Sequence, residues 1–126
     1  MFDGWPGMPG ALSEGMRCPV GLRKFIEPCL LLFLRDRRAY GYELIEMFST
    51  LGFESVPDPG AVYRNLRRME HEGFVRSRWE LADSGMPRRF YEITEEGEYA
   101  LNAWVKIIEK NKELLEDFLA RYYRTK

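Results

Sequence analysis

Residues 58–75, DPGAVYRNLRRMEHEGFV, carry both a start signal and a stop signal for a helix. Asp58 can accept a backbone N–H at the start, and Pro59 can take the first helical position, where its missing N–H costs nothing. Gly73 is typical of the position just after a helix. At about 100° per residue, three apolar side chains share one side of the predicted helix and should face a core. They are Val62, Leu66 and Met69.

The other side of this predicted helix is cationic. It carries Gly60, Arg64, Arg67 and His71, with Arg68 beside them and Tyr63 at the flank. Such a face is either an ordinary solvated surface or a surface shaped for a polyanion. The lone histidine, between Glu70 and Glu72, is interpreted as a solvent-facing helix residue, because further metal ligands at a defined spacing are missing.

The hydrophobic period changes to two directly after this helix. In FVRSRWEL, residues 74–81, Val75 and Trp79 alternate with Arg76 and Arg78, as expected for a strand. ADSGMP is turn material, and RRFYEIT, residues 88–94, is expected to form a second strand with Arg89, Tyr91 and Ile93 on one face. These features predict a β-hairpin.

Two further helices are predicted before residue 58. One starts near Phe25, with Pro28 in its first turn, and is apolar on every side from Leu30 to Leu34. The next follows a break at Gly41 and ends at Gly52. Three helices followed by a hairpin are the plan of a winged helix-turn-helix, so the expected fold is mainly α with a small β-hairpin.

The last segment, residues 95–126, is expected to be one long helix capped by Thr94, because no Gly or Pro interrupts residues 99–124. Apolar residues recur there at alternating intervals of three and four, with one polar member, and form a heptad seam. Its members are Leu101, Trp104, Ile108, Asn111, Leu115, Phe118 and Tyr122. An apolar seam on a projecting helix needs a partner, and a homodimer is the economical prediction.

The position of the cationic helix favours double-stranded DNA as the polyanion, because winged-helix proteins place the helix before the hairpin in a major groove. Arginine suits both phosphates and guanine edges. The arginines of the hairpin can contact DNA or can pair with Glu80 and Glu92 across the strands. The DNA-contacting candidates are Tyr42, Gly60, Ala61, Tyr63, Arg64, Arg67, Arg68, Arg76, Arg78, Arg88 and Arg89.

Composition excludes several other classes. The chain of 126 residues has a net charge of −1 and is 45% hydrophobic and 31% charged, as expected for one soluble domain. There is no secretory signal and no apolar run long enough for a bilayer. The two cysteines, Cys18 and Cys29, suggest neither a metal site nor a disulfide framework. No nucleophile arrangement or phosphate-binding glycine loop is present, so we expect a cytoplasmic protein that is not an enzyme and has no cofactor and no metal.

An apolar cleft between two subunits could take a flat hydrophobic effector. Phe25, Leu32 and Trp104 are the candidates to line it, although an aromatic in a helical stripe is usually a core residue.

Three segments together resemble the PadR-like transcriptional regulators. They are LLLFLRDRRAYGYELIEMF (30–48), GAVYRNLRRMEHEGFV (60–75) and GMPRRFYEITEEGEYAL (85–101). The resemblance implies a homodimeric winged-helix repressor, with the first and last helices in the dimer interface, Tyr63 and its neighbours at DNA, and an aromatic or drug-like ligand that relieves repression. Residues 52–80 look especially like the polyhydroxybutyrate-responsive repressors. Tyr40 departs from the pattern, since the family often has histidine there.

The predicted organisation is a flexible arm at 1–22, a DNA-binding winged helix-turn-helix at 23–94 and a dimerisation helix at 95–126. The rival hypothesis is a winged-helix module that docks on a protein or senses a granule surface without binding specific DNA.

Overall fold

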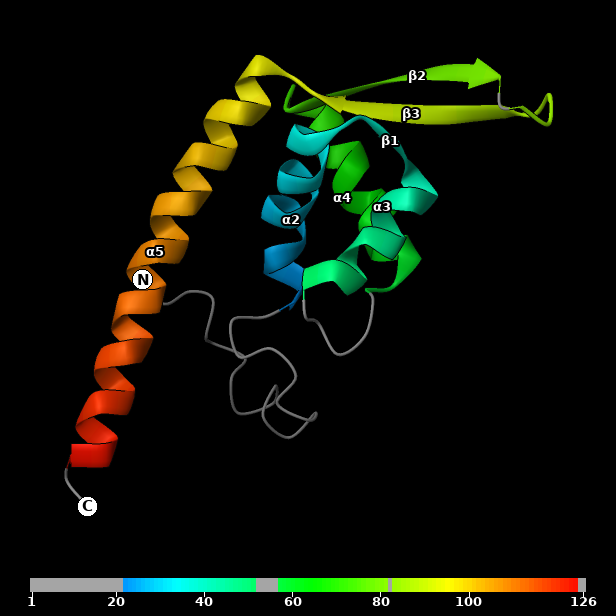
Figure 1. The fold of residues 1–126 in the computed structure, drawn as a ribbon. Coiled ribbons are helices and arrows are strands. Elements are labelled where there is room, and N and C mark those ends of the chain that lie inside the picture. Colours follow the sequence, from blue (N-terminus) through cyan, green and yellow to red (C-terminus); the bar gives the residue numbers. More distant parts are fainter. Residues whose placement is uncertain (1–21, 52–56, 82, 125–126) are drawn as a thin grey trace.

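The computed structural model describes residues 22–51, 57–81 and 83–124 (Figure 1). The predicted flexible arm therefore lies outside the described residues except for residue 22. The elements are α2 (Leu22–Asp36), β1 (Ala39–Tyr40), α3 (Gly41–Met47), a 3-10 turn η2 (Phe48–Leu51), α4 (Pro59–His71), β2 (Val75–Leu81), β3 (Pro87–Ile93) and α5 (Glu95–Arg124). This is a mainly helical chain with a small antiparallel sheet, so the predicted fold class is confirmed.

Helix α4 begins and ends as its sequence predicts. Pro59 is its first residue, and the Asp58 carboxylate accepts the N–H of Ala61 at 3.1 Å. Gly73 follows the helix with a φ of 87°, a left-handed conformation that favours glycine. The three residues of the apolar stripe, Val62, Leu66 and Met69, are fully buried.

Helix α2 starts earlier than predicted. It begins at Leu22, so Pro28 lies inside the helix and not in its first turn. A proline there cannot donate to the carbonyl four residues before it. The preceding turn nevertheless stays helical, because Ile26 is 1% exposed and its burial in the core favours the helix. The predicted all-round burial is largely confirmed, since Leu32 is the one partly exposed residue from Leu30 to Leu34.

Gly41 does not break the chain as predicted, but is the first residue of α3. The Tyr40 N–H just before it donates to the Glu43 side chain at 2.9 Å, which satisfies the helix start. Gly41 is required for space: an added Cβ would lie 2.6 Å from Cε1 of Tyr63, a residue of α4. The glycine thus permits close contact between α3 and α4.

The predicted hairpin is confirmed, and a third strand joins it. Strands β2 and β3 are antiparallel, with Val75 opposite Ile93 and Arg78 opposite Phe90. Strand β1 pairs with the other edge of β3, so the order is β1-β3-β2. Its two residues are too few to show a period of two. The far half of the hairpin extends beyond the helices (Figure 1).

One core joins the helices to the sheet. Its centre is α2, against which α3, α4, α5 and β3 all pack. The Phe33 and Phe48 rings meet edge to face with centroids 5.1 Å apart. Buried residues of every layer contribute: Ile26, Cys29, Leu30, Leu31, Phe33, Leu34, Ala39, Leu44, Phe48, Val62, Leu66, Met69, Val75, Tyr91 and Leu101.

Helix α5 is attached to the body only near its start. Thr94 accepts the N–H of Gly97 at 3.0 Å and caps the helix as predicted. A Cβ at Gly97 would lie 2.1 Å from the Phe74 carbonyl oxygen, so α5 approaches the backbone before β2 closely. Leu101 is buried, whereas Phe118 is 68% exposed, and the second half of α5 projects away from the body (Figure 1). In the part of the chain that the structure describes, no helix is apolar enough over a sufficient length to cross a membrane.

Candidate nucleic-acid interface

The outward side of α4 carries two arginines whose charges are not balanced nearby. Arg64 and Arg67 are exposed, and neither forms an ion pair with a described carboxylate. Gly60 keeps the start of the helix thin, and an added Cβ would lie 2.9 Å from Oδ2 of Asp58. Ala61 beside it is small and partly buried. This arrangement lets a ligand approach the helix start and meet free guanidinium groups farther along.

Arg68 lies on the same helix but turns back toward the body. Its Nη1 is 2.9 Å from Oε1 of Glu27 on α2, and its Nη2 donates to Asn65 at 2.6 Å. Glu72 is a second, longer ion-pair partner at 3.5 Å. The guanidinium of Arg68 is therefore already neutralised within the protein.

Two hairpin arginines are also paired within the protein. Nη2 of Arg78 is 2.7 Å from Oε2 of Glu92, and Nε of Arg76 is 3.8 Å from the same oxygen. Arg78 is also 3.7 Å from Glu80. These are the cross-strand pairs that the alternative interpretation of the hairpin arginines expects.

Arg89 fixes the hairpin against α4. Its Nε donates to the Ser77 hydroxyl at 2.9 Å, and its Nη2 lies 3.7 Å from Oε1 of Glu70. The Ser77 hydroxyl in turn donates to Glu70 at 2.7 Å. Since Glu70 belongs to α4, this triad sets the angle between the helix and the wing. The Arg89 guanidinium also lies 5.5 Å from the Trp79 ring centroid.

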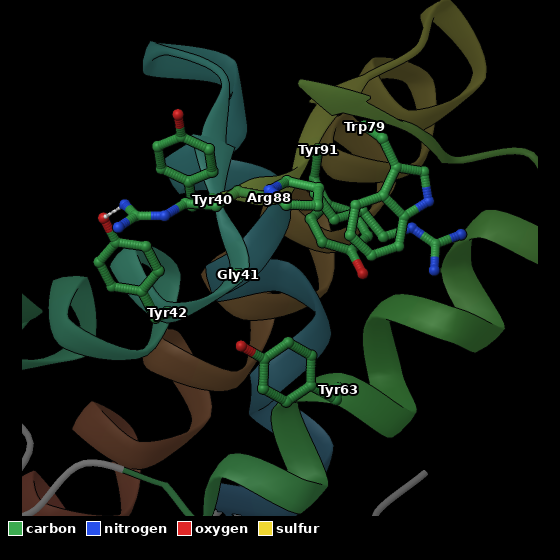
Figure 2. Close-up of a pocket in the computed structure, with 9 residues that line it drawn as sticks. Tyr40, Gly41, Tyr42, Tyr63, Trp79, Arg88 and Tyr91 are labelled. Atoms are coloured by element: carbon green, nitrogen blue, oxygen red, sulfur yellow. Dashed lines mark hydrogen bonds between the residues drawn. The ribbon is translucent and has the colours of Figure 1, made fainter. Parts of the chain in front are cut away.

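Arg88 has no carboxylate partner among the described residues. Its Nη1 donates to the Tyr42 hydroxyl at 2.6 Å, and its guanidinium lies 5.3 Å from the Tyr40 ring centroid and 5.2 Å from that of Tyr42 (Figure 2). The Tyr40 and Phe90 rings stack with centroids 4.0 Å apart. Aromatic contacts thus orient Arg88 without neutralising its charge.

A shallow cavity of about 590 Å³ lies between α3, α4 and the wing (Figure 2). Its lining brings together residues far apart in the sequence: Tyr40, Gly41, Tyr42, Tyr63, Trp79, Pro87, Arg88, Arg89 and Tyr91. The Tyr63 ring lies over Gly41 at the start of α3. Its walls combine aromatic rings with hydroxyl and guanidinium donors, a surface that suits a sugar-phosphate backbone.

Tyr91 is a buried residue in the lining of this cavity. Burial raises the pKa of its hydroxyl above the ordinary value of 10.0. The nearby positive charges of Arg89 and Arg67 act in the opposite direction, whereas Glu70 adds to the rise. Tyr91 therefore stays a neutral hydrogen-bonding group at physiological pH.

Sequence reasoning did not select Tyr40, Trp79 or Tyr91 for this surface. The alternation along β2 predicted that Trp79 and Val75 share one face, and Val75 is buried whereas Trp79 is 62% exposed. The difference arises because the hairpin extends past the core. The signal in the sequence that could have identified Trp79 was its position as an aromatic residue near the tip of the predicted wing.

The other predicted site residues lie away from this surface. Phe25, Leu32 and Trp104 are partly buried and pack on the shared core. Along the heptad seam, exposure rises from the buried Leu101 to the exposed C-terminal members. Among the described residues, no three His, Cys, Asp or Glu side chains are grouped to hold a metal ion.

Comparisons with known proteins agree with this architecture. A transcriptional regulator structure from Thermoplasma acidophilum is 26% identical, with a TM-score of 0.69 over 79% of this chain and 94% of that chain. A PadR family regulator from Clostridium difficile is 24% identical, with a TM-score of 0.66 over 75% and 98% of the two chains. PadR of Bacillus subtilis, solved with operator DNA, is 23% identical, with a TM-score of 0.59 over 64% and 46%.

At 24% and 23% identity, the last two similarities show that the fold is shared and nothing more. No curated protein matches the sequence. The model of the PadR-like transcriptional regulator family, however, matches residues 30–103, which is more than half of the chain. This protein therefore belongs to the PadR-like family, whose members regulate transcription and are not enzymes.

Proposed function

We propose that this protein is a homodimeric, sequence-specific DNA-binding repressor whose helix α4 enters the major groove. The observation that carries the proposal is the pair of exposed arginines on α4, Arg64 and Arg67, without carboxylate partners in the described chain. A guanidinium group without a partner can bind a phosphate or a guanine edge without first losing an internal ion pair.

The residues around α4 take different parts in this proposal. Arg88, Tyr42 and Tyr63 contact the DNA backbone beside α4, since each presents a polar group at the cavity between helix and wing. Gly60 and Ala61 admit the duplex close to the start of α4. The arginines already paired within the protein, Arg68, Arg76, Arg78 and Arg89, position α4 and the wing and add less to DNA affinity.

The dimer forms through α5, whose projecting half bears an apolar face. Phe118 is 68% exposed, Tyr122 56% and Leu115 40%, and all three belong to the heptad seam. A second copy of the same helix matches this repeat, and Asn111 fixes its register. Residues 23–94 then form the DNA-binding unit and residues 95–126 the dimerisation helix. Such a dimer presents two α4 helices to half-sites about 34 Å apart.

A small hydrophobic or aromatic effector is proposed to release DNA by binding beside Phe25, Leu32 and Trp104. These residues come from α2 and α5 and are partly buried, so a ligand there contacts both the body and the dimerisation helix. The closer resemblance to polyhydroxybutyrate-responsive repressors stays a prediction.

The test is an anisotropy titration of the protein with the DNA directly upstream of its own gene, at two salt concentrations. We expect binding that survives an excess of unrelated duplex and weakens as salt rises, because cations condensed on the DNA are released. Equal affinity for unrelated DNA, or no binding by an intact dimer, would contradict the proposal and favour a protein-docking module.

A further inference from the structure

One carboxylate on α2 contacts both α4 and α5. Oε1 of Glu27 accepts a hydrogen bond from Nη1 of Arg68 at 2.9 Å, and Oε2 accepts one from the indole Nε1 of Trp104 at 3.3 Å. The Glu27 side chain is 13% exposed. With Arg68 on α4 and Trp104 on α5, the two oxygens of one side chain hold two different helices.

The other attachment of α5 to the α4 end of the body is a backbone junction. The Thr94 N–H donates to the Phe74 carbonyl at 3.0 Å, and the Thr94 hydroxyl donates to the Gly73 carbonyl. Gly97 packs against the same Phe74 carbonyl. This junction fixes where α5 starts, and the buried Leu101 holds the following turns against the core. The Trp104 contact, ten residues after Thr94, is a polar contact farther along the helix, where it can influence the tilt of α5.

We propose that Glu27 is a positioning residue that transmits the tilt of α5 to α4. The proposal rests on the DNA-binding function proposed above and concerns its regulation. When a partner subunit or an effector moves Trp104, the Glu27 carboxylate keeps its hydrogen bond to either Trp104 or Arg68 and loses the other one. Arg68 then loses or regains its partner, and the end of α4 shifts relative to the dimer axis.

The chemistry of the contact suits this role. A largely buried carboxylate needs at least one hydrogen-bond donor, because an unpaired charge is costly away from water. The Arg68 guanidinium can instead remain paired with Glu72, which lies 3.5 Å away, and Arg68 is 45% exposed. The arrangement therefore has an alternative state in which α4 keeps its own ion pair while Glu27 stays with α5.

The first experiment tests the contact without DNA. In a ¹H–¹⁵N spectrum of the full chain, the W104F variant assigns the Trp104 indole resonance among the three tryptophans. We expect R68Q to move this resonance downfield, because a carboxylate released from the guanidinium accepts the indole hydrogen more strongly. E27Q should move it upfield and abolish the response to R68Q. The matched control R76Q removes an ion-paired arginine from the wing and should leave the resonance in place.

The second experiment measures whether the contact matters for DNA. We expect W104F and E27Q each to lower DNA affinity about three- to tenfold, because the loss of one or two hydrogen bonds usually has an effect of this size. The double variant W104F/E27Q should bind no worse than E27Q alone, because both changes break the same link. Y99F, which alters an 80% exposed residue of α5, is the control and should bind as the wild type does.

The outcomes separate this inference from the proposed function. An indole resonance that ignores R68Q, or that still responds to it in E27Q, overturns the link through Glu27. Losses of DNA affinity that multiply in the double variant, or a W104F variant with wild-type affinity, overturn its role in binding. If the wild type binds no specific DNA, the proposed function fails, while the spectra still decide the contact. Sedimentation of each variant confirms that it remains folded and assembled.

Discussion

At the scale of single residues, the arginines differ chiefly in what surrounds them. Arg67 faces solvent without a carboxylate partner, whereas Arg76 is held beside Glu92 at 3.8 Å. An exposed ion pair is weak, but it does reduce the positive charge that a phosphate meets. The neighbours of each arginine therefore decide how much it can add to DNA affinity.

Replacing Arg67 should affect DNA binding more than replacing Arg76. We expect R67A to weaken specific binding by ~1–3 kcal/mol if the side chain reads a base, with relaxed preference at one position. R76A, the matched control with the same charge change, should alter it by less than about 0.5 kcal/mol. Anisotropy titrations with the same duplex compare the two, and equal losses would contradict the distinction between free and paired arginines.

The buried tyrosine of the cavity predicts a stability change at alkaline pH. Burial raises the pKa of Tyr91 in the folded chain above its ordinary value of 10.0. The unfolded chain therefore releases this proton first, and the free energy of unfolding should fall as pH rises above about 10. Urea unfolding at about pH 9 and about pH 11 measures the fall. Y91F should lessen it, and an identical pH dependence in Y91F would show that another group is responsible.

Sequence reasoning could select the arginines but could not tell which were free. Arg64 and Arg68 are four residues apart on one helix and look alike in the sequence. The difference between them is Glu27, which is 41 residues before Arg68 and reaches it only through the packing of α2 on α4. Long-range ion pairs of this kind leave no local pattern.

At the scale of elements, local sequence signals were sufficient to predict a helix or strand where the packing of the core favoured the same structure. The start and end of α4, the hairpin and the Thr94 cap follow from residues within a few positions of each other. Strand β1 and the early start of α2 could not be predicted, because both depend on contacts with distant segments. Strand β1 exists through its pairing with β3, and Pro28 is tolerated in α2 because neighbouring residues are buried.

The cap of α4 is the element-scale feature that a single substitution can test. D58A removes the carboxylate that accepts the Ala61 N–H and should lower the free energy of unfolding by ~1 kcal/mol. D58S keeps a side-chain acceptor and should restore most of the loss. Thermal or urea unfolding measures both variants, and a D58A variant as stable as the wild type would exclude a capping role.

At the scale of the whole molecule, the proposed dimer depends on the projecting half of α5. The apolar seam of this helix continues past the body and is exposed to solvent within the described residues. The spacing of the seam was visible in the sequence, but where the helix leaves the body depends on how the core packs around Leu101.

A charge in the exposed seam should separate the subunits. We expect F118K to turn the dimer into a monomer, because a lysine there would be buried against the partner's apolar face. N102K adds the same charge to an exposed residue of α5 outside the seam and should leave the dimer intact. Sedimentation velocity measures both masses, and a dimeric F118K would place the interface elsewhere.

We propose that two outward α4 helices occupy successive major grooves, and methylation protection of a bound duplex shows which groove they enter. With the full chain bound to its own upstream DNA, guanine N7 atoms should be protected from dimethyl sulfate in two clusters about one helical turn, roughly 10 base pairs, apart. The double variant R64A/R67A should lose this protection while remaining dimeric. Protection confined to adenine N3 in the minor groove, or unchanged protection in R64A/R67A, would contradict the account.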